Sequence, residues 1–192
     1  MTISNLQAIY RYPRGQSNLP IVIHLHGWDG QMLSGDPADA YYLDRISQWG
    51  VFACSVGMRG RSGAAGSRDV SGREIYDIYD ALSHIRQNFS GLVSPDKAAI
   101  MGVSGGGGNV LAAACKFPDA WTVIADFYGM SDYGRDASHS WYVDNNYEGY
   151  EADMRAGIGG TPAEVPDAYF ARDATYAIAN FTGGLLHLFH DD

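Results

Sequence analysis

Short apolar runs alternate along the chain with longer segments in which apolar residues recur at the helical period. The apolar runs predict five buried strands, at 19–25, 51–56, 98–103, 122–127 and 185–189. The helical period predicts helices over 36–49, 74–89, 109–117 and 162–179, most clearly over 74–89, and the stretches 58–72 and 129–160 are expected to be irregular. Near-continuous apolar strands separated by helices are typical of a parallel sheet covered on both faces. The predicted fold class is therefore α/β, with a mostly parallel sheet and helices on both of its faces.

No internal repeat or linker divides the sequence, so residues 1–192 are expected to form one domain. Lys and Arg number 13 against 22 Asp and Glu, a formal charge of −9, which disfavours binding to nucleic acid or to an anionic membrane. No apolar run reaches the length of a membrane span, and residues 1–12 lack the pattern of a signal peptide. Cys54 and Cys115 lie in apolar surroundings typical of reduced thiols, although a single bridge between them stays open. We therefore expect a cytoplasmic protein.

The most informative sequence is GVSGG at 102–106, which joins a predicted strand to a predicted helix. Its Gly-x-Ser-x-Gly spacing matches the nucleophile elbow, a strained turn that exposes the serine hydroxyl, here Ser104. Glycines are required two residues before and after the serine, because Cβ atoms there would collide with neighbouring backbone. The Gly105 N–H, at the helix start, is suited to bind an oxyanion. A glycine-rich turn with an incidental serine is the alternative, whereas the Gly-x-Gly-x-x-Gly pattern of a dinucleotide loop is not matched.

A second turn, HGWDG at 26–30, follows the first apolar strand and is expected at the carboxyl edge of the sheet, beside the elbow. Its Trp28 N–H is the candidate for a second oxyanion donor, and an ordinary strand-ending turn is the alternative. His24 and His26 share one face of the strand, which raises the hypothesis of a metal site. Only Asp29 is close enough in sequence to complete such a site. We therefore predict neither a metal ion nor a cofactor.

Taken together, these stretches resemble the α/β-hydrolase superfamily, in the branch of prolyl oligopeptidase-like serine hydrolases, dienelactone hydrolases and acetyl xylan esterases. The resemblance spans nearly the whole chain: HGWDG at 26–30, RGRSGAAGSRD at 59–69, EIYDIYDALSHIR at 74–86, VSPDKAAIMGVSGGGG at 93–108, GGTPAEVPDAYFARDATY at 159–176 and GGLLHLFHDD at 183–192. The elbow and its upstream strand are specific, and the others are supportive. The resemblance implies that Ser104 is the nucleophile, that Gly105 and Trp28 supply the oxyanion N–H groups, and that Asp77 is structural.

One part of the family pattern is not matched. Family members have a catalytic acid and then a catalytic histidine after the serine, and neither motif is found in residues 1–192. The resemblance puts the acid near position 194 and the histidine later still, so the chain is expected to lack the last strand and helix of the fold. Their loss would leave a sheet edge and an apolar patch exposed. We therefore expect the chain to self-associate through that edge.

Other residues of the chain offer alternatives for the acid and the base. Asp132 and His139 follow the serine in the right order, but no strand between them would bring the histidine round to the elbow. Asp191 or Asp192 could supply the acid, without a histidine downstream. The last strand and its end contain His187 and His190, for which core or strand-end roles are expected.

The function predicted from these residues is hydrolysis of carboxylic esters through an acyl-enzyme on Ser104. A peptidase of the prolyl oligopeptidase type is the first alternative, and a catalytically incomplete domain that binds a ligand or partner is the second. The expected substrate is a small ester or a short peptide. The aromatic segment 128–150, with Trp141, Tyr142 and Tyr147, could either line a substrate pocket or pack as a covering loop.

Overall fold

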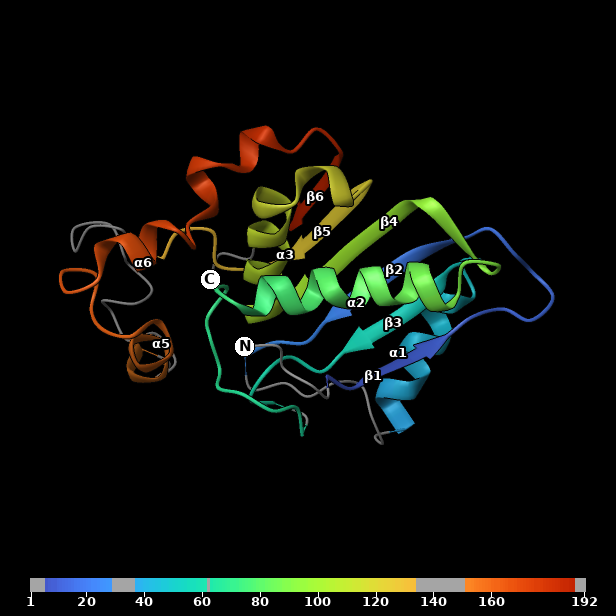
Figure 1. Ribbon diagram of the computed structural model, residues 1–192, viewed down its shortest axis with the longest axis horizontal. Coiled ribbons are helices and arrows are strands. Elements are labelled where there is room, and N and C mark those ends of the chain that lie inside the picture. The colour runs from blue at the N-terminus through green and yellow to red at the C-terminus, as the bar shows by residue number, and fades with distance from the viewer. Residues whose placement is uncertain (1–5, 29–36, 62, 134–150, 189–192) are drawn as a thin grey trace.

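The computed structural model describes residues 6–28, 37–61, 63–133 and 151–188 (Figure 1). The strands of this part of the chain form one six-stranded sheet in the order β1-β3-β2-β4-β5-β6. Only β1 runs antiparallel to its neighbour, β3, and the other neighbouring pairs are parallel. The strands are β1 Ala8–Arg11, β2 Leu19–Leu25, β3 Phe52–Val56, β4 Val93–Val103, β5 Val123–Phe127 and β6 Gly184–Leu188. The mostly parallel sheet confirms the predicted fold class.

Helices cover both faces of the sheet, α2 and α3 on one and α1 on the other (Figure 1). The alternation of side chains along β2 accounts for this, because Ile21 and Ile23 pack in one core cluster and Val22 packs in the other. The helices are α1 Pro37–Ser47, α2 Glu74–Asn88, α3 Gly105–Lys116, α5 Glu151–Ile158 and α6 Pro166–Phe170, with 3-10 turns η1 Pro118–Ala120, η3 Ala174–Tyr176 and η4 Ile178–Asn180. No helix among these described residues is long and apolar enough to cross a bilayer.

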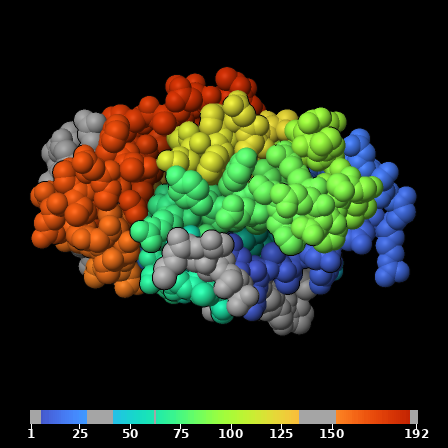
Figure 2. Space-filling view, viewed as in Figure 1, coloured from blue at the N-terminus to red at the C-terminus, as the bar shows by residue number. Residues whose placement is uncertain are grey.

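Of the segment after β5, the helices α5 and α6 lie at one end of the molecule, beyond the end of the sheet (Figure 1). In the space-filling view its orange and red atoms form one continuous mass against the green atoms of α2 (Figure 2). The Trp28 ring, just after β2, lies close to Gly157 of α5. This segment therefore covers the carboxyl end of β2, which is the end of the sheet where the elbow is expected.

Several predicted boundaries are wrong for identifiable reasons. α3 begins at Gly105 rather than 109, because close packing of the glycines replaces the helix propensity that they lack. α5 lies in the segment expected to be irregular, and the helix predicted over 162–179 is instead the short α6 with two 3-10 turns, since Pro166 begins a new helix. The edge strand β1 was not predicted, because its four residues are mostly exposed and carry no apolar run.

β6 forms one edge of the described sheet, and all five of its residues are exposed. Leu186 is 47% exposed, and Leu185 and Leu188 are similar. An exposed apolar edge of this kind is the feature from which self-association was expected.

Candidate active site

Ser104 lies at the tight turn between β4 and α3. Its backbone has φ 55° and ψ −122°, a conformation that side-chain-bearing residues rarely adopt and that costs about 1–3 kcal/mol. The Ser104 N–H donates to the Phe127 carbonyl at the end of β5, 2.9 Å away, and its own carbonyl accepts from Gly108 in α3. The serine is only partly buried. The turn therefore has the strained backbone expected of a nucleophile elbow, with the serine accessible.

The two glycines that flank Ser104 at a distance of two residues lie where a side chain would not fit. A Cβ on Gly102 would lie 2.5 Å from the Gly106 carbonyl carbon, so the strand and the helix touch directly across the turn. A Cβ on Gly106 would lie 2.5 Å from the carbonyl oxygens of both Leu25 and His26. The first turn of α3 therefore rests on the end of β2, in agreement with the reason given for these glycines from the sequence.

The backbone of the turn after β2 runs beside Ser104. A Cβ on Gly27 would lie 3.9 Å from the Ser104 Oγ, and a Cβ on Gly105 would lie 2.9 Å from the Trp28 nitrogen. Within the described part of the chain, the backbone N–H groups of Trp28 and Gly105 donate no hydrogen bond. Gly105 is in the first turn of α3, where N–H groups have no partner within the helix. Two backbone N–H groups with no acceptor among the described residues therefore lie next to each other beside the serine, as an oxyanion site requires.

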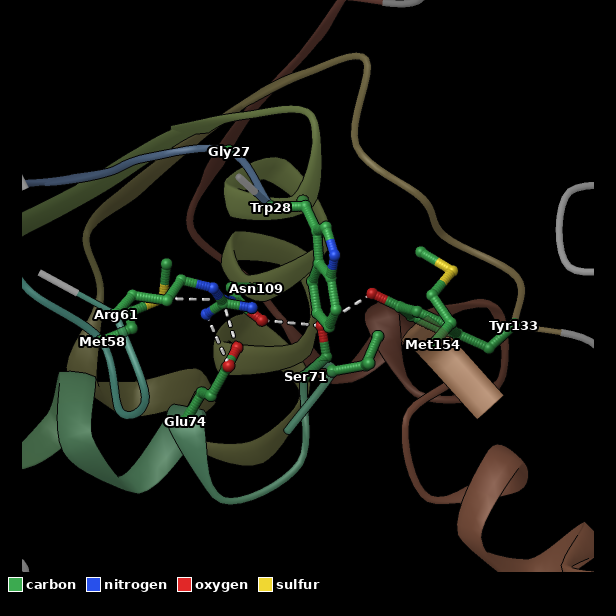
Figure 3. Close-up of a pocket in the computed structure, with 11 residues that line it drawn as sticks. Gly27, Trp28, Met58, Arg61, Ser71, Glu74, Asn109, Tyr133 and Met154 are labelled. Carbon is green, nitrogen blue, oxygen red and sulfur yellow. Dashed lines mark hydrogen bonds and ion pairs between the residues drawn. The ribbon is translucent and has the colours of Figure 1, made fainter. Parts of the chain in front are cut away.

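The Trp28 side chain lines a small hollow together with apolar and polar residues, among them Arg61, Glu74 and Asn109 (Figure 3). The Arg61 guanidinium lies over its ring, 4.5 Å from the centroid, and forms a 2.6 Å ion pair with Glu74. Burial raises the pKa of Glu74, and the Arg61 charge opposes that shift. Glu74 also accepts from Asn109 Nδ2 on α3 at 3.0 Å and from the Asp69 N–H at 3.1 Å.

The same hydrogen-bond network continues from Asn109 of α3 through Ser71 to Tyr133, which lies after β5. Ser71 Oγ donates to Asn109 Oδ1 and shares a second 2.7 Å hydrogen bond with the Tyr133 hydroxyl. This polar cluster was not predicted, because its members lie far apart in the sequence, up to the 72-residue separation of Arg61 and Tyr133. The one available signal was Glu74, an acidic residue that lies next to the apolar stripe of the predicted helix 74–89.

A second ion pair lies next to the first, between the same loop and the same helix. Arg59 donates to both carboxylate oxygens of Asp77, at 2.6 and 2.5 Å, and the Asp77 side chain is 5% exposed. The pair joins the loop after β3 to α2, which agrees with the structural role expected for Asp77.

The candidate acids and bases fall in different places. Asp132 lies beside Asp173, and burial together with the Asp132 carboxyl group raises the pKa of Asp173. His139, Asp191 and Asp192 lie outside the described residues, as does His190 of the strand end.

The structure brings together one acid–histidine pair that the sequence did not suggest. Asp126 of β5 is fully buried and lies 2.6 Å from His187 Nδ1 of β6, while its other oxygen accepts from the Gly129 N–H. Burial raises the pKa of Asp126, and its hydrogen bonds oppose the shift. The available signal was a carboxylate inside the apolar run 122–127. Because both of its oxygens are used in joining β6 and the following turn to β5, Asp126 has a structural place in the sheet.

His24 in β2 and His26, which follows the strand, are neutral near pH 7. Burial lowers the pKa of each to about 4, and the charges of Arg61 and Arg68 contribute at His26. His26 Nδ1 lies 2.8 Å from the Gly27 carbonyl. No group of three or more potential metal ligands occurs among the described residues, so the His24–His26 pair is not joined there by a third ligand.

A mostly parallel sheet whose long strand β4 turns through a serine at positive φ into a buried helix has the α/β-hydrolase fold. The chain belongs to the prolyl oligopeptidase family, whose model matches residues 47–159, more than half of the sequence. No curated protein sequence matches the chain.

Solved structures with this fold include both peptidases and esterases. A Bacteroides ovatus structure assigned to dipeptidyl aminopeptidase IV has a TM-score of 0.75 at 17% identity, over 95% of this chain and 25% of that one. Pyrococcus horikoshii acylaminoacyl peptidase has a TM-score of 0.69 at 15% identity, over 94% of this chain and 28% of its own. Acetyl xylan esterase from Paenibacillus sp. R4 has a TM-score of 0.62 at 17% identity, over 97% of this chain and 73% of its own. The chain thus spans about a quarter of the length of the two peptidase structures, and at these identities the similarity is one of fold.

Proposed function

We propose that this domain is a serine hydrolase that cleaves carboxylic esters through an acyl-enzyme on Ser104. Ser104 Oγ attacks the ester carbonyl carbon, a histidine accepts the hydroxyl proton, and the Trp28 and Gly105 N–H groups bind the resulting oxyanion. Expulsion of the alcohol, protonated by the same histidine, leaves the acyl-enzyme, which water then hydrolyses to the free acid. The main supporting observation is that two backbone N–H groups, which donate no hydrogen bond within the described part of the chain, lie side by side next to a serine in a strained turn.

The substrate we propose is a small ester. An alkoxide leaves more readily than an amine, so an ester makes the smaller demand on the protonation of the leaving group. The similarity in fold to an acetyl xylan esterase, over 73% of that chain, supports this choice. Membership of the prolyl oligopeptidase family and the similarity to two peptidases support the alternative, a short peptide.

Labelling with a fluorophosphonate probe tests the nucleophile. In the full-length protein that carries this sequence, we expect one labelled serine, absent from Ser104→Ala. Ser90→Ala, which removes an exposed hydroxyl from the turn after α2, is the matched control and should label like the native protein. Labelling that persists in Ser104→Ala would overturn the assignment, and a native protein that does not label would favour a hydrolase-like binding domain instead.

The substrate class is tested by comparing kcat/KM for p-nitrophenyl acetate and for an aminoacyl p-nitroanilide, each of which releases a coloured product that can be followed by absorbance. We expect the ester to be favoured by more than the intrinsic difference in reactivity, measured as hydroxide-catalysed hydrolysis of the two compounds. A preference for the anilide after this correction would support the peptidase instead.

A further inference from the structure

The two proposed oxyanion donors are carried by different parts of the fold. Trp28 is in the turn after β2, whereas Gly105 is in the first turn of α3. Their relative position decides whether both N–H groups can reach one oxygen atom, because a displacement of about 1 Å in a catalytic group can cost on the order of 100-fold in rate. What fixes the turn and the helix to each other is therefore part of the chemistry.

One buried carboxylate, that of Glu74, connects the turn after β2 to α3. Glu74 is 1% exposed and binds the Arg61 guanidinium, which in turn lies on the face of the Trp28 ring. On its other side Glu74 accepts from Asn109, four residues after Gly105 on the next turn of α3. Figure 3 shows Arg61, Glu74 and Asn109 together on one side of the Trp28 ring, with Tyr133 and Met154 on the other.

The contacts in this connection are of strong kinds. The Arg61–Glu74 pair is charge-assisted and almost completely shielded from water, with side-chain exposures of 2% and 1%. Trp is the most favourable ring for a cation–π contact, and such a contact is stronger when it is desolvated. Arg61 Nε has no hydrogen-bond partner among the described residues, so the ion pair with Glu74 is its main compensation for burial.

We propose that Glu74 and Arg61 are positioning residues, which hold the Trp28 and Gly105 N–H groups at the separation that binds an oxyanion. This inference rests on the proposed function. It assigns no contact with substrate to either side chain, since both act through Trp28 and Asn109. It predicts that loss of the pair weakens binding of the tetrahedral state while leaving the affinity for the planar substrate nearly unchanged.

The neighbouring Arg59–Asp77 pair provides a matched control. It joins the same loop to the same helix one turn further along, and within the described residues Asp77 bonds to Arg59 alone. Among the hydrogen bonds and ring contacts of the described residues, none joins Arg59 or Asp77 to Trp28 or Asn109, and the pair reaches Glu74 only through the charge of Arg59. Glu74→Gln and Asp77→Asn therefore make the same chemical change in two ion pairs, one buried and one partly buried. Only the first is bonded to residues that hold the oxyanion site.

The experiment measures kcat and KM for p-nitrophenyl acetate, and the Ki of an arylboronic acid that forms a tetrahedral adduct with the serine, in the full-length protein. For Glu74→Gln we expect kcat to fall about 10- to 100-fold, the boronate Ki to rise in parallel, and KM to stay within about twofold. For Asp77→Asn we expect a lower unfolding temperature and a kcat within about threefold of the native value. If Glu74→Gln leaves Arg61 unpaired and does not fold, Arg61→Met/Glu74→Gln removes both charges and should show the same loss in kcat.

The outcomes separate this inference from the proposed function. Native protein that labels at Ser104, with equal losses of kcat in Glu74→Gln and Asp77→Asn, would overturn the positioning role and leave the hydrolase intact. A loss in Glu74→Gln that appears in KM, with an unchanged boronate Ki, would also overturn it. Native protein that does not label at Ser104 would refute the proposed function, and the positioning role with it.

Discussion

Replacing Gly106 by alanine should move the first turn of α3, which carries the Gly105 N–H, away from the turn after β2, which carries the Trp28 N–H. The new Cβ would lie 2.5 Å from the carbonyl oxygens of Leu25 and His26, well inside van der Waals contact. Both oxygens belong to backbone at the end of β2, so relief requires α3 to move away by roughly 0.5 Å or more. Overpacking of this kind costs about 3 kcal/mol, at the upper end of its usual range. Alanine gains about 1 kcal/mol over glycine in a helix, so we expect a net loss of about 2 kcal/mol.

For a domain of this size, such a loss lowers the unfolding temperature by about 4–8 °C. Differential scanning calorimetry gives this shift, and kcat for p-nitrophenyl acetate should fall at least 10-fold because the Gly105 N–H moves with the helix. Gly91→Ala is the control, since Gly91 is exposed and a Cβ there meets nothing within 4 Å. That variant should be neutral or slightly stabilised. A Gly106→Ala protein with native stability and native kcat would refute the close approach of α3 to β2.

Three further predictions concern other parts of the fold. The pKa of His24 is about 4 in the folded protein against an ordinary 6.5, so the unfolded chain binds more protons between these values and stability falls as the pH drops through them. His24→Phe should abolish about 3 kcal/mol of that loss, measured in urea titrations at pH 7 and pH 4, and an undiminished loss in this variant would contradict the prediction. Tyr169→Phe removes a 2.9 Å hydrogen bond to the Gly160 carbonyl and should lower the free energy of unfolding by about 1 kcal/mol, seen as a lower urea midpoint with an unchanged slope. Leu186→Lys puts a charge on the exposed edge strand and should reduce self-association of the 192-residue chain in sedimentation velocity; equal association of both proteins would exclude β6 as the contact.

The elements that the sequence predicted well are those whose pattern is local. The strands β2, β3 and β5 are short apolar runs, and α2 carries an apolar stripe at the helical period, so each is visible in its own residues. The turn at Ser104 is predictable for a different reason. It requires glycine at two fixed positions, Gly102 and Gly106, because a Cβ at either would collide with backbone atoms. β1 and α5 have no such pattern, since β1 is a mostly exposed edge strand and α5 follows a long polar segment.

What the sequence did not reveal is the set of partners that burial creates. In the sequence Glu74 and Asp77 cannot be distinguished, because both are acidic residues in the first turn of the same helix. Only the fold shows that one of them meets Asn109 and Arg61 while the other meets Arg59. Such pairings depend on which loop packs against which helix. The spacing of residues along a single helix or strand does not indicate this tertiary packing.

The composition of α3 explains why its first turn needs outside support. Four glycines open this helix, at a cost of about 3–4 kcal/mol relative to alanine, so intrinsic propensity does not hold its first turn in place. The absence of side chains is also what lets the turn rest directly on the carbonyl oxygens at the end of β2. Asn109 is the first residue after the glycines with a side chain that can anchor the helix, and it binds Glu74. The close contact and the anchor are therefore two parts of one arrangement, in which tertiary contacts fix the N–H groups of a helix start that is weak by itself.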